Sequence, residues 1–159
     1  MSKAFTRESD DAEPVGGFAA RVQAPGSKNY ITAAGAKRLR AELDALRAKR
    51  LAEGAPANSL DARMRHLQSV VASTIVPAPP ADRRKIAFGS LVELRHGDGE
   101  TARYRIVGLE ESNPAEGLIS WLSPLAKALI SHAPGETVRF QTPAGEETLT
   151  ILSVEQPDP

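Results

Sequence analysis

The sequence predicts an α+β protein in which an antiparallel helical hairpin precedes a domain of about five antiparallel strands and one short helix. Three observations lead to this fold class: leucines at helical spacing, a proline-rich segment after them, and apolar alternation with a period of two beyond it. The 159 residues are accordingly divided into a tail (1–27), a short antiparallel coiled coil (28–76), a linker (77–85) and a C-terminal domain (86–156).

The first helix is expected to begin after Thr32, whose hydroxyl can accept from backbone N–H groups of the first turn. Leucines then recur at i, i+4 and i+7, namely Leu39, Leu43 and Leu46. Gly54 and Pro56 end the pattern, so the helix is predicted to run to about Glu53.

A second helix is predicted from about Ser59, and its apolar side chains follow heptad spacing. The stripe consists of Leu60, Met64, Leu67, Val71 and Thr74. Two helices of this kind joined by a short Gly/Pro/Asn turn favour an antiparallel coiled-coil hairpin. Residues 1–27 combine glycine, proline and acidic residues with few apolar groups, so we expect a disordered tail there.

Beyond the prolines of the linker, alternating apolar residues predict the strands of a sheet. The expected strands cover residues 91–95, 102–107, 118–122, 138–140 and 148–152. Pro124 is suited to the first turn of a short helix that continues to Ser131. Runs of strands with one helix indicate an α+β domain of modest core size.

The net charge of zero results from two parts of opposite sign. Residues 28–85 carry twelve basic and five acidic residues, whereas residues 86–159 carry five basic and eleven acidic residues. The chain has no cysteine, which excludes disulfides and thiolate chemistry. Its apolar runs are too short for a membrane span, and its N-terminus has no apolar signal segment, so we expect a cytoplasmic protein that does not bind membranes.

Several motifs follow one another in the order and spacing of a known family. They are Tyr30-Ile31-Thr32-Ala33-Ala34-Gly35, Val107-Gly108, Ile119-Ser120-Trp121-Leu122-Ser123-Pro124-Leu125-Ala126-Lys127-Ala128-Leu129, Gly135-Glu136-Thr137-Val138 and Thr142-Pro143-Ala144-Gly145-Glu146. Residues 28–155 thereby resemble the GreA/GreB family of bacterial transcription elongation factors. The first eight residues also resemble the start of some GreB-like proteins.

The resemblance implies a C-terminal domain like that of FK506-binding proteins, which docks on RNA polymerase at the rim of its secondary channel. The resemblance further implies that the coiled coil enters the channel, where it can contact nascent RNA indirectly. The segment that matches the family's docking surface contains Ser123, Pro124 and Lys127. Family members often have an acid before this Ser-Pro pair, and Leu122 stands there instead. The resemblance implies a regulatory protein without a cofactor, and not an enzyme.

The end of the hairpin departs from the cleavage-active members of the family. These carry a Gly-Asp-x-x-Glu-Asn-like loop whose two acids help to hold a magnesium ion, and residues 50–65 contain no such motif. The only acids at this end are Glu53 and Asp61, beside cations that include Arg50 and Arg63. Cations compete with a metal for carboxylates, so we expect no metal site.

Several functional interpretations remain open at this point. The favoured one is a regulator that binds RNA polymerase without stimulating transcript cleavage. A cleavage factor that uses Glu53 and Asp61 is the first alternative, and a regulator of nucleoside diphosphate kinase, as described for the short-armed Rnk proteins, is the second. A peptidyl-prolyl isomerase is suggested by the fold alone. The basic face of the hairpin fits a solvated surface, an acidic protein channel or nucleic-acid phosphates.

Overall fold

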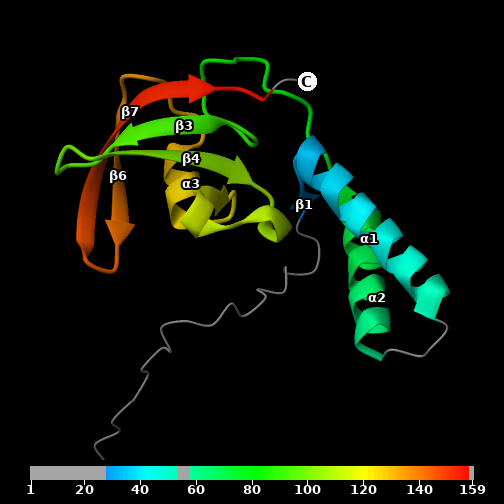
Figure 1. Ribbon diagram of the computed structural model, residues 1–159. Coiled ribbons are helices and arrows are strands. Elements are labelled where there is room, and N and C mark those ends of the chain that lie inside the picture. The colour runs from blue at the N-terminus through cyan, green and yellow to red at the C-terminus, as the bar shows by residue number, and fades with distance from the viewer. Residues whose placement is uncertain (1–27, 54–57, 158–159) are drawn as a thin grey trace, which may run out of the picture.

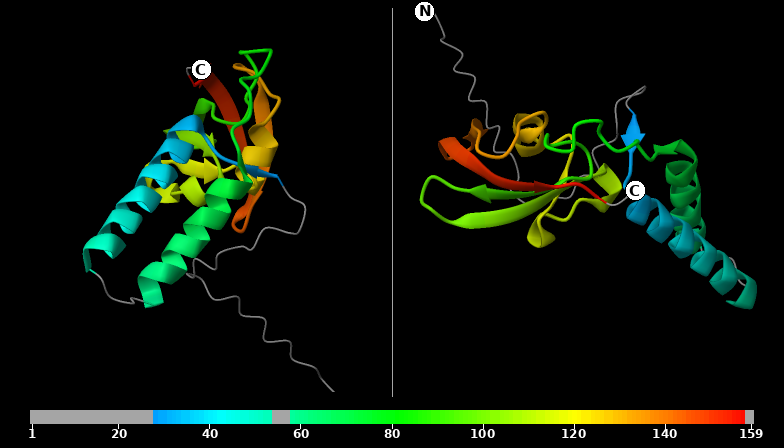
Figure 2. Two further views of the ribbon diagram at one scale, coloured as in Figure 1. Left: turned by 90° about the vertical axis from the view of Figure 1, so that its right-hand side faces the viewer. Right: turned by 90° about the horizontal axis from the view of Figure 1, so that it is seen from above.

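The computed structural model describes residues 28–53 and 58–157, so the predicted tail 1–27 lies outside the described residues. Two parts are visible in Figure 1: a five-stranded sheet with helix α3 against it, and an arm of two helices, α1 and α2, that projects from one end of the sheet. The right-hand view in Figure 2 shows the arm extending away from the sheet domain. The predicted α+β fold class, a helical hairpin followed by a sheet domain, is confirmed.

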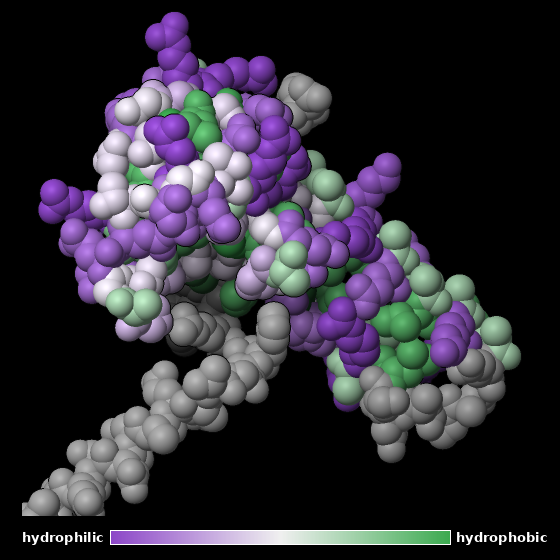
Figure 3. All heavy atoms as spheres, turned by 60° about the vertical axis from the view of Figure 1, so that its left-hand side comes forward, coloured by the Kyte–Doolittle hydropathy of each residue, from purple (hydrophilic) through white to green (hydrophobic). Residues whose placement is uncertain are grey.

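The arm consists of α1 (Ala33–Glu53) and α2 (Asn58–Ser73), which pack against each other in opposite directions. The Thr32 hydroxyl accepts a hydrogen bond from the N–H of Gly35 at 3.0 Å, which confirms Thr32 as the cap of α1. The arm has its own small core, formed by Ile31, Ala36, Leu39, Leu43, Met64, Leu67 and Val70. Two helices cover each other on one side only, and hydrophobic side chains therefore remain visible among charged ones along the arm (Figure 3).

The end of α2 differs from the prediction. Val70 is buried, whereas Thr74, the last predicted residue of the apolar stripe, has already left the helix. The hydroxyl groups of Ser73 and Thr74 donate to the carbonyl oxygens of Val70 and Val71, both at 3.1 Å. Such local bonds offer the backbone an alternative to another helical turn, and they coincide with the end of α2.

Two short strands, which the sequence analysis missed, join the beginning and the end of the arm. Strand β1 (Asn29–Tyr30) pairs in parallel with β2 (Thr74–Ile75), and the N–H of Ile31 donates to the carbonyl of Ile75 at 3.0 Å. A two-residue strand is too short for an alternating pattern, so periodicity could not reveal it. The pair closes the root of the arm where the chain enters and leaves it.

The sheet has the strand order β5-β4-β3-β7-β6. Its strands are β3 (Leu91–Arg95), β4 (Thr101–Val107), β5 (Leu118–Ser120), β6 (Thr137–Thr142) and β7 (Gly145–Glu155). All neighbouring pairs are antiparallel except β4 and β5, which are parallel, so the sheet is mostly antiparallel. The connection between β4 and β5 contains two 3-10 turns, η1 (Leu109–Glu111) and η2 (Pro114–Glu116). It reverses the chain before β5 starts, so that β5 runs in the same direction as β4.

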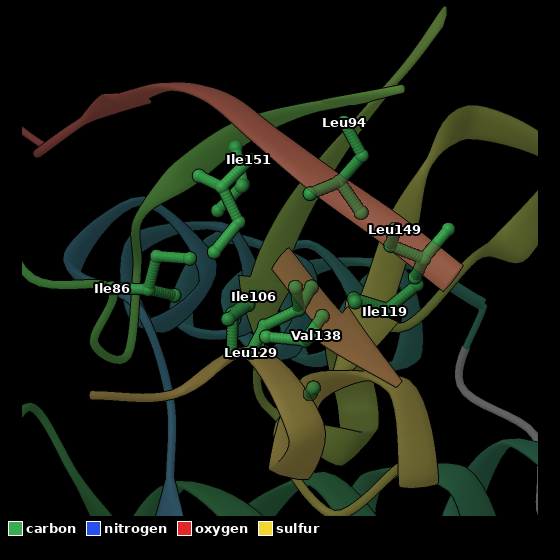
Figure 4. Packing of buried hydrophobic residues seen from close by; sticks show 10 residues of the cluster. Ile86, Leu94, Ile106, Ile119, Leu129, Val138, Leu149 and Ile151 are labelled. Atoms are coloured by element: carbon green, nitrogen blue, oxygen red, sulfur yellow. The ribbon is translucent and has the colours of Figure 1, made fainter. Parts of the chain in front are cut away.

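The core of the sheet domain lies between the sheet and α3 (Pro124–Leu129). Figure 4 shows side chains from β3, β4, β5, β6 and β7 pointing toward Leu129 of this helix. The buried residues are Ile86, Val92, Leu94, Ile106, Ile119, Ala126, Leu129, Val138, Leu149 and Ile151. Burying such side chains stabilises a fold by about 1.5–3 kcal/mol each. Within the described part of the chain, no helix is both long enough and apolar enough to cross a bilayer.

Candidate functional site

The predicted docking residues lie together on α3 and the residue before it. The Ser123 hydroxyl accepts from the N–H of Ala126 at 3.1 Å, and Pro124 occupies the first turn, where its missing N–H costs nothing. Pro124 and Lys127 are exposed, while Ala126 and Leu129 are buried in the core. The segment therefore presents a proline and a cation to solvent on a helix that the core holds in place. Their role in docking stays a prediction.

An aromatic cluster connects this segment to the root of the arm. The ring of Trp121 lies edge-on to the ring of Tyr30, with centroids 5.0 Å apart, and Tyr30 also contacts Phe88 at 5.8 Å. Aromatic pairs in such geometries contribute about 0.5–1.5 kcal/mol beyond their buried area. Tyr30 belongs to the arm root, whereas Phe88 and Trp121 belong to the sheet domain, so the cluster joins the two parts.

The acids predicted at the arm's far end do not form a metal site in the described residues. Asp61 of α2 forms an ion pair with Arg50 of α1, so its carboxylate is already engaged by a cation. The side chain of Glu53 lies outside the described residues. No group of three acidic or histidine side chains that could hold a metal exists within residues 28–53 and 58–157.

A second ion pair links the two helices closer to the middle of the arm. Both the Nε and the Nη2 atoms of Arg63 donate to Oε1 of Glu42, at 3.0 and 2.7 Å. The structure thus uses Arg50 and Arg63 for cross-helix contacts, although exposed pairs of this kind stabilise a fold only by about 0–1 kcal/mol. Other cations of the arm are exposed to solvent, among them Lys37, Arg38, Arg40 and Arg65.

The root of the arm is held by a buried carboxyl group from the sheet domain. Glu111 of η1 is only 6% exposed, and its Oε2 atom accepts from the N–H of Thr32 at 2.8 Å and from the N–H of Gly108 at 3.1 Å. Its Oε1 atom accepts from the Thr32 hydroxyl. A buried carboxyl group is costly unless it is hydrogen-bonded, and this one has three donors. It also lies at the N-terminus of α1, which has no acidic residue in its own first turn.

Two glycines allow the arm and the sheet domain to approach each other this closely. A Cβ atom on Gly35 would lie 2.0 Å from Oε1 of Glu111, and a Cβ atom on Gly108 would lie 2.2 Å from the carbonyl oxygen of Tyr30. Both distances are far below van der Waals contact. Gly35 and Gly108 are within the motifs noted in the sequence, but the motifs do not show that Glu111 approaches both of them.

A largely apolar hollow of about 190 Å³ lies beside this joint, between the arm root and the linker. It is lined by Ile31, Thr32, Ala33, Val76, Pro77, Ala78, Pro79, Phe88, Gly89 and Pro157. Phe88 is the only aromatic residue in this lining, because Tyr30 and Trp121 pack against each other nearby.

Residues 81–156 match the family described as transcription elongation factor, GreA/GreB, C-terminal domain. Residues 81–156 therefore form a GreA/GreB-family domain. The GreA/GreB domain supplies both the Ser123-Pro124 segment and Glu111, so the docking segment predicted above and the acid at the arm root belong to one structural unit. The recognition made from the sequence motifs is confirmed.

Curated relatives include GreA and GreB proteins of several bacteria. Transcription elongation factor GreB of Neisseria meningitidis is 39% identical over 98 residues, which cover 60% of this chain and 60% of that protein. GreA of Helicobacter pylori is 40% identical over 97 residues, covering 60% of this chain and 59% of that protein. GreB of Haemophilus influenzae is 42% identical over 96 residues, covering 60% and 61%. The chain thus spans about three fifths of the length of these GreA and GreB relatives.

Two solved structures have a similar fold. GreA factor homolog 1 (Gfh1) of Thermus thermophilus aligns over 81% of this chain and 99% of that chain, with 22% sequence identity and a TM-score of 0.42. A GreA/GreB elongation factor from Nitrosomonas europaea aligns over 80% and 98%, with 23% identity and a TM-score of 0.42.

Proposed function

We propose that the protein is a transcription elongation factor that binds RNA polymerase at the rim of its secondary channel and does not stimulate transcript cleavage. The absence of cleavage stimulation is inferred from Asp61, whose carboxylate forms an ion pair with Arg50 across the arm. A magnesium ion needs one or two free carboxylates that converge on it. A carboxylate bound to a guanidinium group, among further cations, is a poor ligand for a dication.

The GreA/GreB domain supports the choice of partner. Its family match and the exposed Pro124 and Lys127 on α3 favour docking through this helix. The relatives named above are transcription elongation factors, and this chain matches about three fifths of their length. Polymerase binding, regulation without catalysis and action in the cytoplasm are therefore parts of the same proposal.

The arm supports a role inside the channel mouth. Its exposed Lys37, Arg38 and Arg40 give the first helix a basic surface, and the polymerase's catalytic centre is acidic. Complementary charges steer encounter and fix orientation more than they add affinity. A basic arm in the channel mouth would hinder the entry of nucleotides or exclude longer factors that use the same dock. No aromatic residue lies between Thr32 and Ile86, so stacking of the arm on RNA bases is not part of the proposal.

The proposal predicts binding without cleavage on stalled elongation complexes of the cognate polymerase. We expect the protein to bind these complexes while the RNA shortens no faster than with polymerase alone, since the carboxylate of Asp61 is held by Arg50. The measurement is a time course of RNA length beside a titration of binding. Magnesium-dependent cleavage that is lost in Asp61→Asn and retained in Asp44→Asn would instead make this protein a cleavage factor. Asp44 is the matched control because it is an exposed acid of the same arm.

A second prediction concerns the docking segment. Replacing Lys127 with glutamate together with Pro124→Ala is expected to weaken polymerase binding about tenfold, equivalent to about 1.4 kcal/mol, because charge reversal at an interface rim slows association. Arg95→Glu reverses the charge of an exposed cation on β3 and is the matched control. A titration in which both variants bind like the unaltered protein would remove Lys127 and Pro124 from the docking surface.

Two other functions receive less support. A regulator of nucleoside diphosphate kinase, the Rnk-like alternative, would bind that kinase in a titration and would not bind RNA polymerase. Peptidyl-prolyl isomerase activity rests on the fold alone, and the hollow at the joint has only Phe88 as an aromatic lining residue.

A further inference from the structure

We propose that Glu111 is a positioning residue that fixes the direction of the arm relative to the docking helix, so that the arm reaches one defined place once the sheet domain is bound. This inference rests on the proposed function for its meaning, but its structural part concerns the free protein. The contacts of Glu111 with Thr32, and its close approach to Gly35, are called the clamp below.

The clamp joins two parts that have separate cores. The buried residues of the arm and those of the sheet domain form two clusters that share no member. Each part therefore buries its own apolar side chains, and the arm does not need Glu111 to form a core. The clamp fixes the direction of the arm, because the strength of a hydrogen bond depends on its angle whereas apolar contacts are non-directional.

The carboxyl group of Glu111 bonds to both sides of the joint at once. Thr32 donates its N–H and its hydroxyl from the arm side, and Gly108 donates its N–H from the sheet side. The same Thr32 hydroxyl accepts from the N–H of Gly35, so the cap of α1 and the joint share one side chain. Rotation of the arm about its root would move both Thr32 donors away from the carboxyl group of Glu111.

Gly35 shows how little space the clamp leaves. Glycine in a helix is destabilising by roughly 0.5–1 kcal/mol relative to alanine, yet it lies in the first turn of α1. The reason is visible at the joint, where a Cβ atom would lie 2.0 Å from Oε1 of Glu111. Alanine at this position would favour the helix and at the same time expel the carboxyl group from its place.

The neighbouring Glu110 contacts the second helix of the arm. Its Oε2 atom lies 3.6 Å from Nε2 of His66 in α2, while Glu111 bonds at the start of α1. The turn η1 therefore contacts both sides of the arm, through Thr32 at the start of α1 and His66 in the middle of α2. His66 and Glu110 are considerably more exposed than Glu111, so their contact is the weaker of the two.

The length of the arm makes its direction at the root important. Helix α1 has 21 residues and is therefore about 30 Å long. A rotation of about 10° at its root would displace the far end by about 5 Å, roughly the pitch of one helical turn. Docking through α3 alone would place the arm in a channel only if the angle between the two parts is fixed.

The first experiment measures the angle in the free protein. The chain has no cysteine, so a pair of spin labels can be placed at Ala48→Cys on α1 and Thr101→Cys on β4, both of which are exposed. Pulsed dipolar spectroscopy should give one narrow distance distribution for this pair. We expect Glu111→Gln to broaden it, because an amide cannot accept from all three donors, and Glu116→Gln, an exposed glutamate of the same domain, to leave it narrow.

Two further variants separate positioning from folding. Gly35→Ala should broaden the distribution while the helix content of the protein stays equal or rises. Thr32→Ser keeps the hydroxyl group and should leave the distribution narrow, whereas Thr32→Ala should broaden it. An unchanged narrow distribution in both Glu111→Gln and Gly35→Ala would overturn the inference.

The second experiment uses the polymerase. Glu111→Gln should bind elongation complexes with unaltered affinity, while the increase that the unaltered protein causes in the apparent KM for the incoming nucleotide is lost. If Glu111→Gln lowers the affinity for polymerase as much as it lowers the increase in apparent KM, Glu111 is a docking or folding residue and the positioning role is overturned. A variant that still raises the apparent KM as the unaltered protein does would overturn it as well. If the unaltered protein does not bind polymerase, the proposed function fails, and the distance measurement still decides whether the clamp sets the angle.

Discussion

Leu67→Ala is expected to destabilise the arm by about 3 kcal/mol and to leave the sheet domain folded. Leu67 is fully buried in α2, at the centre of a core of only seven buried residues. Truncating its side chain removes the contacts of three carbon atoms, Cγ and the two Cδ methyl groups, and leaves a cavity that a two-helix hairpin cannot easily fill. The remaining core is too small to compensate, so the helices should unfold locally before the sheet does.

Amide hydrogen exchange measures this effect element by element. In Leu67→Ala, the amides of α1 and α2 should exchange much faster, while those of β3 and β7 keep their protection. Leu51→Ala is the matched control, since Leu51 lies in the same arm and is 85% exposed. Equal protection of the arm in both variants would contradict the assignment of Leu67 to the core of the arm.

The second large effect is expected at Gly108, where the backbone of the sheet domain passes the backbone of the arm root. Gly108→Ala should lower the free energy of unfolding by about 2 kcal/mol, because the new methyl group would lie 2.2 Å from the carbonyl oxygen of Tyr30. The backbone of Gly108 has a φ of −69°, which any residue adopts, so the cost is steric and not conformational. A backbone atom cannot move aside as a flexible side chain can, and the joint must open.

Urea unfolding of Gly108→Ala tests this expectation beside Gly97→Ala. Gly97 lies in the turn between β3 and β4, and a Cβ atom there would meet its nearest neighbour at 3.8 Å, an ordinary contact. The control should therefore unfold close to the unaltered protein. Similar midpoints for both variants would mean that the arm root tolerates a wider separation from the sheet.

Much of the fold could be predicted from the sequence because the decisive patterns are local. Thr32 caps α1, the leucine stripe packs against α2, and Pro124 opens α3, each through residues a few positions apart. The pairing of β4 with β5 in parallel was not foreseen, since the alternation that identifies a strand says nothing about its direction. The two-residue strands at the arm root carry no pattern at all.

The candidate site was predictable only where it is continuous in the chain. Ser123, Pro124 and Lys127 lie within one motif and therefore appeared as a unit. Glu111 did not, because a glutamate between strands is ordinarily a solvated residue, and its partner Thr32 is 79 positions away. Gly35 at the beginning of a helix and Gly108 directly after a strand are local signs that another part of the chain lies close by. They do not indicate which residue that is.

The contact between Trp121 and Tyr30 provides an optical signal from the joint. Trp121 is the only tryptophan of the chain, and its indole ring contacts the ring of Tyr30 at the arm root. Indole emission moves to longer wavelength when water reaches the ring, and a tyrosine nearby transfers excitation to it. The intrinsic fluorescence of the unlabelled protein therefore reports the opening of the joint separately from the melting of the helices, which circular dichroism follows.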